Sequence, residues 1–237
     1  MKDLVRAFGI SPIGLIHIGA HHAEEIDEYT VTGVRGSLPI IWVEANPTIA
    51  ENLIKKLNLA ENRVINTAAW DLSGLILKLN VASSTSSSSL LELGTHIEKY
   101  PDITYQSQVE VMTSRMEELL GTDDKHDFLV LDIQGAEANA IRGFGKKLKQ
   151  IKWVYMEVAK SEIYKGSGTV EDIDQLMAAA GFKRIITFWQ RKLGWGDALY
   201  IQDDWLLSIK RNRKSEIGMI LRWKLRNWIP EAAFLCW

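Results

Sequence analysis

Four acidic side chains lie at or just after the ends of short apolar runs: Glu44, Asp71, Asp132 and Glu157. Carboxylates accept the hydroxyl protons of a ribose or take the proton of an alcohol, so these positions suit nucleoside binding or general-base chemistry. The runs before Asp132 and around Glu157 are expected to be neighbouring parallel strands, whose ends share one rim. Asp132 and Glu157 are therefore the catalytic candidates, with ion pairing or helix capping as the alternative for both.

A turn of small residues, Gly19 and Ala20, follows the first apolar run. A glycine there lets a ligand approach the backbone closely. Glu44 lies 25 residues after Gly19, close to the roughly 20-residue spacing at which an acid meets a ribose in nucleotide-binding folds. The stretch 69–71, Ala-Trp-Asp, ends another run and could contact an adenine edge. Together these positions predict a nucleoside-binding site.

The usual phosphate-binding signatures are incomplete. The turn lacks the second and third glycines of the dinucleotide fingerprint, and the glycine-rich loop of NTPases is absent from the chain. Glu24 and Glu25 open a helical stretch at residues 23–26, where they would repel a phosphate group. An acidic site suits a cofactor that carries an ammonium and a sulfonium group, so the sequence favours S-adenosylmethionine over NAD or ATP.

The elements that must position these residues alternate along the chain. Short, mostly apolar runs are typical of strands covered on both faces in a parallel sheet. We expect such strands at residues 14–18, 40–43, 64–69, 128–132 and 153–158, and two final strands at 184–188 and 198–201.

Two clear helices are expected between these strands. Residues 47–57 carry an apolar stripe, with Asn46 as a suitable cap and Pro47 at the first helical position. Residues 169–181 begin with a capping pair, Thr169 and Asp172, and end at a glycine. The alternation predicts an open, mostly parallel α/β sheet.

One stretch breaks this alternation. Residues 74–81 and 108–112 read as strands, and eight small polar residues, 82–89, lie between them. Such a stretch is typical of a flexible loop, and the functional alternative is a mobile lid over a site.

Six stretches, in this order, resemble FkbM-type S-adenosylmethionine-dependent methyltransferases: residues 18–21, 42–47, 69–71, 87–91, 127–137 and 155–158. The resemblance covers about residues 14 to 203. It implies a Rossmann-like methyltransferase sheet of seven strands, mostly parallel with an antiparallel last strand. It also implies O-methylation of a hydroxyl on a sugar, a glycan or another small metabolite, often in bacterial polysaccharide biosynthesis.

The resemblance further implies a set of cofactor-binding residues. These are Gly19, Ala20 and His21 along the methionine moiety, Glu44 with Ala45 and Asn46 at the ribose, Ala69, Trp70 and Asp71 around adenine, and Asp132 near the amino group or the transferred methyl.

Four residues after the strand at 74–81 could contact the methyl acceptor: Ser88, Ser89, His96 and Tyr100. The alternative for His96 and Tyr100 is an ordinary surface helix that ends at Pro101. No dense metal-ligand motif is visible, so no metal ligand is assigned. Because carboxylates suit magnesium, metal assistance stays open as an alternative.

Two positions depart from the family pattern. The chain has His17 where the first strand usually carries an acid, and Ala23 where the turn usually closes with glycine. A histidine within an apolar strand is typical of a hydrogen-bonded core residue. These departures keep open a second interpretation, a non-catalytic binding or scaffold protein on the same fold.

The composition of the 237 residues, with 46% hydrophobic and 24% charged residues, is that of a globular protein. A single cysteine, Cys236, excludes an intrachain disulfide and a thiolate metal cluster. The chain has no apolar window of membrane-spanning length and begins without a signal-peptide pattern, so a cytoplasmic protein is the default expectation.

The net charge of −2 hides an asymmetry. Residues 208–237 contain seven basic and two acidic residues, which leaves the rest of the chain at −7. We therefore divide the chain into a methyltransferase domain, 1–207, and a basic, aromatic-rich tail, 208–237, that is expected to be helical. The tail could dock on the body, associate with a second copy, or contact an anionic membrane surface at the inner face of the membrane.

A nucleic-acid partner is not expected. The basic tail could contact phosphates, but the acidic body opposes this. The Asn/Asp-Pro-Pro-Tyr/Phe motif of amino-methylating enzymes is also absent from the chain.

Overall fold

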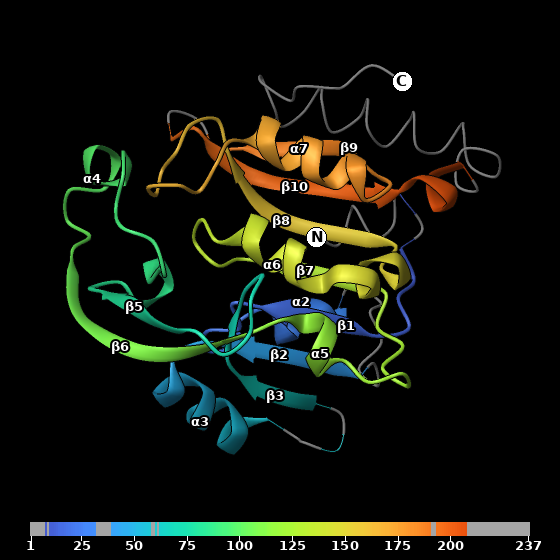
Figure 1. Ribbon diagram of the computed structural model, residues 1–237, viewed down its shortest axis with the longest axis horizontal. Coiled ribbons are helices and arrows are strands. Elements are labelled where there is room, and N and C mark those ends of the chain that lie inside the picture. Colours follow the sequence, from blue (N-terminus) through green and yellow to red (C-terminus); the bar gives the residue numbers. More distant parts are fainter. Residues whose placement is uncertain are drawn as a thin grey trace.

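A seven-stranded sheet forms the centre of the computed structural model, which describes residues 8, 10–31, 39–57, 60, 62–190 and 193–207 (Figure 1). Its strand order is β3-β2-β1-β7-β8-β10-β9, and β10 runs antiparallel to both of its neighbours. In chain order the strands are β1 (Leu15–Ile18), β2 (Ile40–Glu44), β3 (Asn62–Asn66), β7 (Phe128–Leu131), β8 (Trp153–Ala159), β9 (Phe182–Trp189) and β10 (Trp195–Gln202). The predicted fold class is confirmed, including the antiparallel last strand.

Successive residues of the central strands enter two different cores. Leu15 and Phe128 belong to one buried cluster, and Ile16 and Leu129 belong to the other. The parallel pairing of β1 with β7 sets Leu15 beside Phe128 and Ile16 beside Leu129. Because side chains alternate between the faces of a strand, a run that is apolar at every position needs cover on both faces.

Helices supply this cover, and two of them begin at side-chain caps. The helices are α2 (Ile26–Val31), α3 (Pro47–Lys56), α4 (His96–Lys99), α5 (Met116–Leu119), α6 (Glu137–Phe144) and α7 (Val170–Ala179), with 3-10 turns η1 (Thr85–Ser87) and η2 (Gly145–Gln150). The Asn46 side chain caps α3, and Thr169 and Asp172 form a full capping box on α7, as predicted. By contrast, α2 begins later than the expected stretch at 23–26, because Ala23 has a left-handed backbone with φ +54°.

A second, three-stranded sheet stands at the carboxyl ends of the central strands, where β5, β6 and α4 project from the body (Figure 1). Its strands are β4 (Ala68–Ala69), β5 (Ile76–Ala82) and β6 (Tyr105–Ser114). The expectation of one strand over 64–69 is wrong, because the chain leaves the central sheet at Thr67. There the Thr67 N–H donates to the Glu44 carbonyl (3.1 Å) and its hydroxyl donates to the Met112 carbonyl (2.9 Å) of β6.

The connection between β5 and β6 begins with the serine-rich stretch. Residues 83–88 form no strand and contain the single turn η1, as expected of a loop, and Ser89 makes an isolated bridge to Asn80 of β5. Among the described residues no helix is both long and apolar enough to cross a membrane. Residues 208–237 lie outside the described residues, so the domain boundary and the roles of the tail stay predictions.

Candidate functional site

The turn after β1 forms the floor of the site. The N–H groups of Gly19 and Ala20 both donate to the Val43 carbonyl of β2, at 2.9 and 3.1 Å. Gly19 has φ +88°, and a Cβ added to it would overlap the carbonyl oxygen of Asp132. Only glycine therefore lets the ends of β1 and β7 approach this closely.

Glu44, the last residue of β2, fixes this turn from the other side. One carboxylate oxygen accepts the His21 N–H (2.8 Å), and the other accepts the Asn46 N–H (2.7 Å). Burial raises the pKa of Glu44, and these two N–H groups oppose that rise because they stabilise the charged form. Each oxygen keeps a further acceptor position, so the carboxylate can also receive a ligand hydroxyl.

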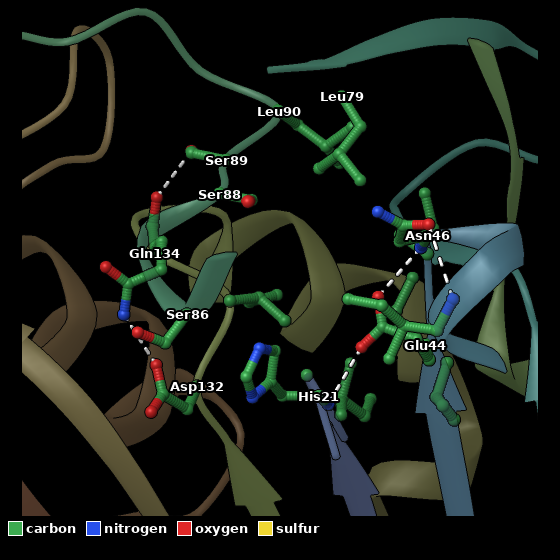
Figure 2. A pocket seen from close by; sticks show the side chains of 18 of the residues that line it. His21, Glu44, Asn46, Leu79, Ser86, Ser88, Ser89, Leu90, Asp132 and Gln134 are labelled. Atoms are coloured by element: carbon green, nitrogen blue, oxygen red, sulfur yellow. Dashed lines mark hydrogen bonds between the residues drawn. The ribbon is translucent and has the colours of Figure 1, made fainter. Parts of the chain in front are cut away.

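A cavity of about 630 Å³, open to solvent, lies above this floor. We call it the strand-end cavity. Figure 2 shows Glu44 and Asn46 on one side of it, Asp132, Gln134 and Ser86 on the other, and His21 between them. Six larger apolar side chains also line it: Ile18, Val43, Ile49, Leu79, Leu90 and Ile133.

The serine-rich segment closes part of the strand-end cavity. His21 joins the two sides, because its Nε2 lies 2.8 Å from the Thr85 hydroxyl and its Nδ1 lies 2.7 Å from Glu24. Further along, the Ser89 hydroxyl donates to the Gln134 carbonyl (2.7 Å), so the segment contacts the turns after both β1 and β7.

A second cavity, of about 670 Å³ including its open mouth, adjoins the first. We call it the aromatic cavity, because four rings line it: His96, Tyr100, Tyr164 and Trp195. The His96 ring lies 4.9 Å from the Tyr100 ring and 5.2 Å from the Tyr164 ring, and the Trp195 indole N–H donates to the Tyr100 hydroxyl (2.7 Å).

Three residues line both cavities, namely Ser86, Asp132 and Gln134. The side-chain NH₂ of Gln134 donates to Asp132 Oδ1 (2.7 Å), and the side-chain oxygen of Gln134 accepts the Tyr164 hydroxyl (2.6 Å). Asp132 is therefore held at the junction, within reach of ligands in either cavity.

Carboxylates crowd this junction. Asp132 and Glu157 each come one residue after the paired Leu131 and Met156, and Glu157 also lines the aromatic cavity. Burial, together with the charges of Asp132, Glu137 and Asp197, raises the pKa of Glu157 well above its ordinary value. Burial also raises the pKa of Asp132, and it raises that of Glu137 to about 7. No group of His, Cys, Asp and Glu among the described residues is arranged to hold a metal ion.

The structure thus brings most of the predicted site residues together. The strand-end cavity is lined by Gly19, His21, Glu44, Ala45, Asn46, Ala69, Ser88, Ser89 and Asp132, and the aromatic cavity by His96, Tyr100, Asp132 and Glu157. Ser88 and Ser89, predicted at the acceptor, face the strand-end cavity instead, and their neighbours Ser86 and Ser87 line the aromatic one. Ala20 is buried beneath the turn.

Trp70 and Asp71 do not line either cavity. The Asp71 carbonyl accepts an Arg115 N–H (2.7 Å), and its carboxylate faces Asn139 of α6 at 3.4 Å. Trp70 lies against α6, where its carbonyl oxygen stands so close that Gly143 has no room for a Cβ. The strand-end cavity is instead bounded on this side by Thr67, Ala68 and Ala69.

His17 is a hydrogen-bonded core residue, as the sequence predicted from its place within an apolar strand. Its ring stacks on Trp42 with centroids 5.2 Å apart, and its Nδ1 pairs with the Tyr29 hydroxyl at 2.9 Å. Burial lowers the pKa of His17 to about 4, so it is neutral near pH 7.

Sequence reasoning missed several lining residues. Thr85 and Ser86 belong to the serine-rich segment, whose possible role as a lid was the available signal. Gln134 stands between Asp132 and a glycine, which marks a tight turn after a strand. Tyr164 and Trp195 carry no local signal, because only the folded chain brings them beside α4.

Comparison with known proteins identifies the class. The model of the Methyltransferase FkbM domain matches residues 17–184, so the chain belongs to the FkbM methyltransferase family. Among curated proteins the chain is similar to 2-O-methyltransferase NoeI of Sinorhizobium fredii (strain NBRC 101917 / NGR234), with 25% identity over 99 residues, 41% of this chain and 35% of that protein.

Among solved structures the chain is similar to the methyltransferase FkbM from Methylobacillus flagellatus KT. The TM-score is 0.51 with 11% sequence identity, and the match covers 81% of this chain and 43% of the other. This likeness concerns the fold. The present chain therefore matches less than half the length of either relative.

Proposed function

We propose that this chain is an S-adenosylmethionine-dependent O-methyltransferase that acts on a hydroxyl of a sugar, a glycan or another small metabolite. The observation that carries the proposal is the junction of two cavities at Asp132. The strand-end cavity offers a place for a nucleoside cofactor, the adjoining aromatic cavity offers a place for an acceptor, and a carboxylate stands between them. Family membership supports methyl transfer as the reaction.

The residues of the strand-end cavity fit this cofactor. Glu44 can accept ribose hydroxyls, the apolar side chains can pack on adenine, and Gly19 forms the floor of the cavity where β1 and β7 approach closely. Neither lysine nor arginine occurs among the described residues that line this cavity. Such a lining suits a cationic cofactor and disfavours one that carries phosphates.

The reaction needs alignment and a proton acceptor. When bound, S-adenosylmethionine supplies the methyl group: the acceptor oxygen forms the new carbon–oxygen bond as the carbon–sulfur bond breaks, and sulfur keeps that electron pair. The two cavities meet, so the protein can hold both reactants in the required line. Asp132 takes the hydroxyl proton, and Glu157 orients the acceptor in the aromatic cavity.

The acceptor class rests on two supports. The name of NoeI describes it as a 2-O-methyltransferase, and this relative is matched over 99 residues. In addition, the aromatic cavity combines flat rings with hydroxyl, amide and carboxylate groups, which suit the apolar faces and the hydroxyls of a sugar ring.

The second candidate is a non-catalytic binding protein on the same fold. It is favoured by His17, which occupies the core in place of the usual acid, and by Ala23, which adopts a left-handed backbone where glycine would be unstrained. This candidate predicts that cofactor binding is absent or does not lead to methyl transfer.

Calorimetry with S-adenosylhomocysteine tests the proposal. Binding is expected, and Glu44→Gln should weaken it by about tenfold, because a charge-assisted hydrogen bond is worth about 1.5 kcal/mol or more. The control Glu51→Gln alters an exposed residue of α3 that pairs with Lys55 and should leave the affinity unchanged. If the wild-type protein gave no binding heat with either S-adenosylmethionine or S-adenosylhomocysteine, this result would contradict the proposal.

A further inference from the structure

From the lining of the aromatic cavity we infer that the acceptor is a neutral or amine-bearing sugar ring and that sugars with an acidic group are excluded. This inference rests on the proposed function, because it assigns the acceptor subsite of that reaction.

The rings define the shape of the ligand that the cavity takes. The Tyr100 and Trp195 rings are held to each other through the indole N–H, and the His96 ring packs between Tyr100 and Tyr164. Rings fixed in this way offer flat apolar surfaces at little entropic cost. They can pack on the C–H faces of a pyranose, and their π-faces also attract an ammonium group.

The charged side chains of the lining decide which sugar rings can enter the aromatic cavity. Two carboxyl groups, Asp132 and Glu157, line the aromatic cavity. The negative charges of Glu137 and Asp197 also act on Glu157. The lining side chains that the structure describes include neither lysine nor arginine. Two lysines of the nearby 160–165 stretch are engaged elsewhere: Lys160 lies over the Trp189 ring and Lys165 pairs with the exposed Glu92.

These charges repel an anionic ligand, and the described lining includes no lysine or arginine to offset that repulsion. A uronic acid or a phosphate would bring a further negative charge against Asp132, in a cluster whose mutual repulsion already raises the pKa of Glu157. A neutral ring can instead donate its hydroxyls to Asp132 and Glu157, and an ammonium group would relieve the repulsion.

Matched sets of methyl glycosides test this inference. Each set contains the neutral sugar, its 2-amino form and its uronic acid, in the glucose, galactose and mannose series. Binding is measured by saturation-transfer NMR titration at about neutral pH, with and without S-adenosylhomocysteine. The neutral and amino members of at least one set should bind, and the uronic acid of that set should bind at least about tenfold more weakly.

Two variants assign the discrimination to the cavity. Asp132→Asn keeps the shape and removes the carboxylate at the junction of the two cavities, so it should reduce the difference between neutral and acidic members by about fivefold or more. Glu110→Gln, a change at an exposed residue on β6, should leave the difference unchanged.

The outcomes separate the two proposals. A uronic acid that binds as tightly as its neutral partner would overturn the inference, as would a protein that binds S-adenosylhomocysteine but no member of any set. Failure of S-adenosylhomocysteine to bind would overturn the proposed function, while the glycoside titrations made without it would still decide the acceptor class.

Discussion

Gln134 is the residue that couples the two cavities. Its backbone is left-handed, with φ +53°, a conformation that a residue with a side chain adopts only at an energetic cost. In return its carbonyl accepts the Ser89 hydroxyl, its amide donates to Asp132, and its side-chain oxygen accepts the Tyr164 hydroxyl. A strained residue with three fixed partners holds Asp132 in one position before any ligand binds.

Gly19 provides a test of how tightly the site is built. Gly19→Ala should lower the free energy of unfolding by about 3 kcal/mol or more, because its Cβ would displace the Asp132 carbonyl as well as strain the backbone. Gly74→Ala is the matched control: it has φ +81° but no atom near the added Cβ, so it should lose only about 1 kcal/mol. Urea unfolding measures both. Equal losses of unfolding free energy in the two variants would mean that the contact between the added Cβ and the Asp132 carbonyl does not affect stability.

Strand-end position was enough to predict the central residues of the site. Gly19, Glu44 and Asp132 each follow or end a buried run, and parallel strands bring such ends to one rim. Asp71 lines neither cavity, because the chain leaves the central sheet at Thr67 and residues 68–69 pair with β6. Whether a residue after a strand faces the ligand depends on this long-range pairing, which hydrophobic periodicity does not contain.

At the scale of elements, the serine-rich segment is a wall held by several neighbouring segments. Asn80 of β5 holds it by paired backbone hydrogen bonds to Ser89, and the Asn80 amide also donates to the carbonyls of Ser89 and Leu91, both at 3.2 Å. Further contacts join Thr85 to His21, Ser89 to Gln134, and Ser83 to Thr104, where the Ser83 N–H donates to the Thr104 carbonyl at 2.9 Å. Apart from the bonds in and beside η1, the polar groups of the segment bond to neighbouring segments, so it forms no longer helix or strand.

Asn80→Ala is expected to loosen this wall. The change removes two side-chain donors and leaves the Gln108 amide, which donates to Asn80 Oδ1 at 2.8 Å, without that acceptor. Hydrogen exchange of residues 83–91 should rise about tenfold, as expected when about 1.4 kcal/mol of local stability is lost. The strands β1 and β7 should keep their protection.

Ser84→Ala is the control for this change, because it removes only an exposed hydroxyl contact with Ser86. It should leave the exchange of residues 83–91 close to that of the wild type. If Asn80→Ala does the same, the side chain of Asn80 does not hold the segment.

The sequence predicted elements well where one signal dominated. The cap at Asn46 and the capping pair at Thr169 and Asp172 place the starts of α3 and α7. It could not show that residues 68–69 join a second sheet with β5 and β6, because two alanines fit either sheet. The order of the central strands was not predicted, and the antiparallel last strand came only from the family resemblance.

At the scale of the whole molecule, two buried groups give opposite pH dependences. Burial lowers the pKa of His17 to about 4, so the unfolded chain binds the proton more tightly and stability falls as the pH drops from about 6.5 towards 4. Burial raises the pKa of Glu137 to about 7, so the folded chain holds this proton more tightly and stability falls as the pH rises from about 4.5 to 7.

Glu137→Gln should isolate the second effect. Relative to the wild type, the variant should gain stability as the pH rises from about 4.5 to 7, reaching about 2–3 kcal/mol, since one unit of pKa corresponds to about 1.4 kcal/mol. Urea unfolding at a series of pH values measures this difference. The charges that face Glu137 are those of Asp132 and Glu157, and the Ile133 N–H donates to it at 3.0 Å.

The control Glu110→Gln should show no such pH-dependent difference, because Glu110 is exposed on β6. A constant difference between Glu137→Gln and the wild type over this pH range would show that the Glu137 carboxyl titrates alike in the folded and unfolded chains.

The two cavities differ in the kind of backbone that builds them. The strand-end cavity is made largely by the ends of β1, β2 and β7, whereas the rings of the aromatic cavity come from the connection that contains α4, from the connection after β8 and from the first residue of β10. Connections accept replacement far more readily than buried strands. Residues 91–104 and 160–168 are thus two connections that protein engineers could exchange between homologues to alter the proposed acceptor cavity without rebuilding the proposed cofactor site.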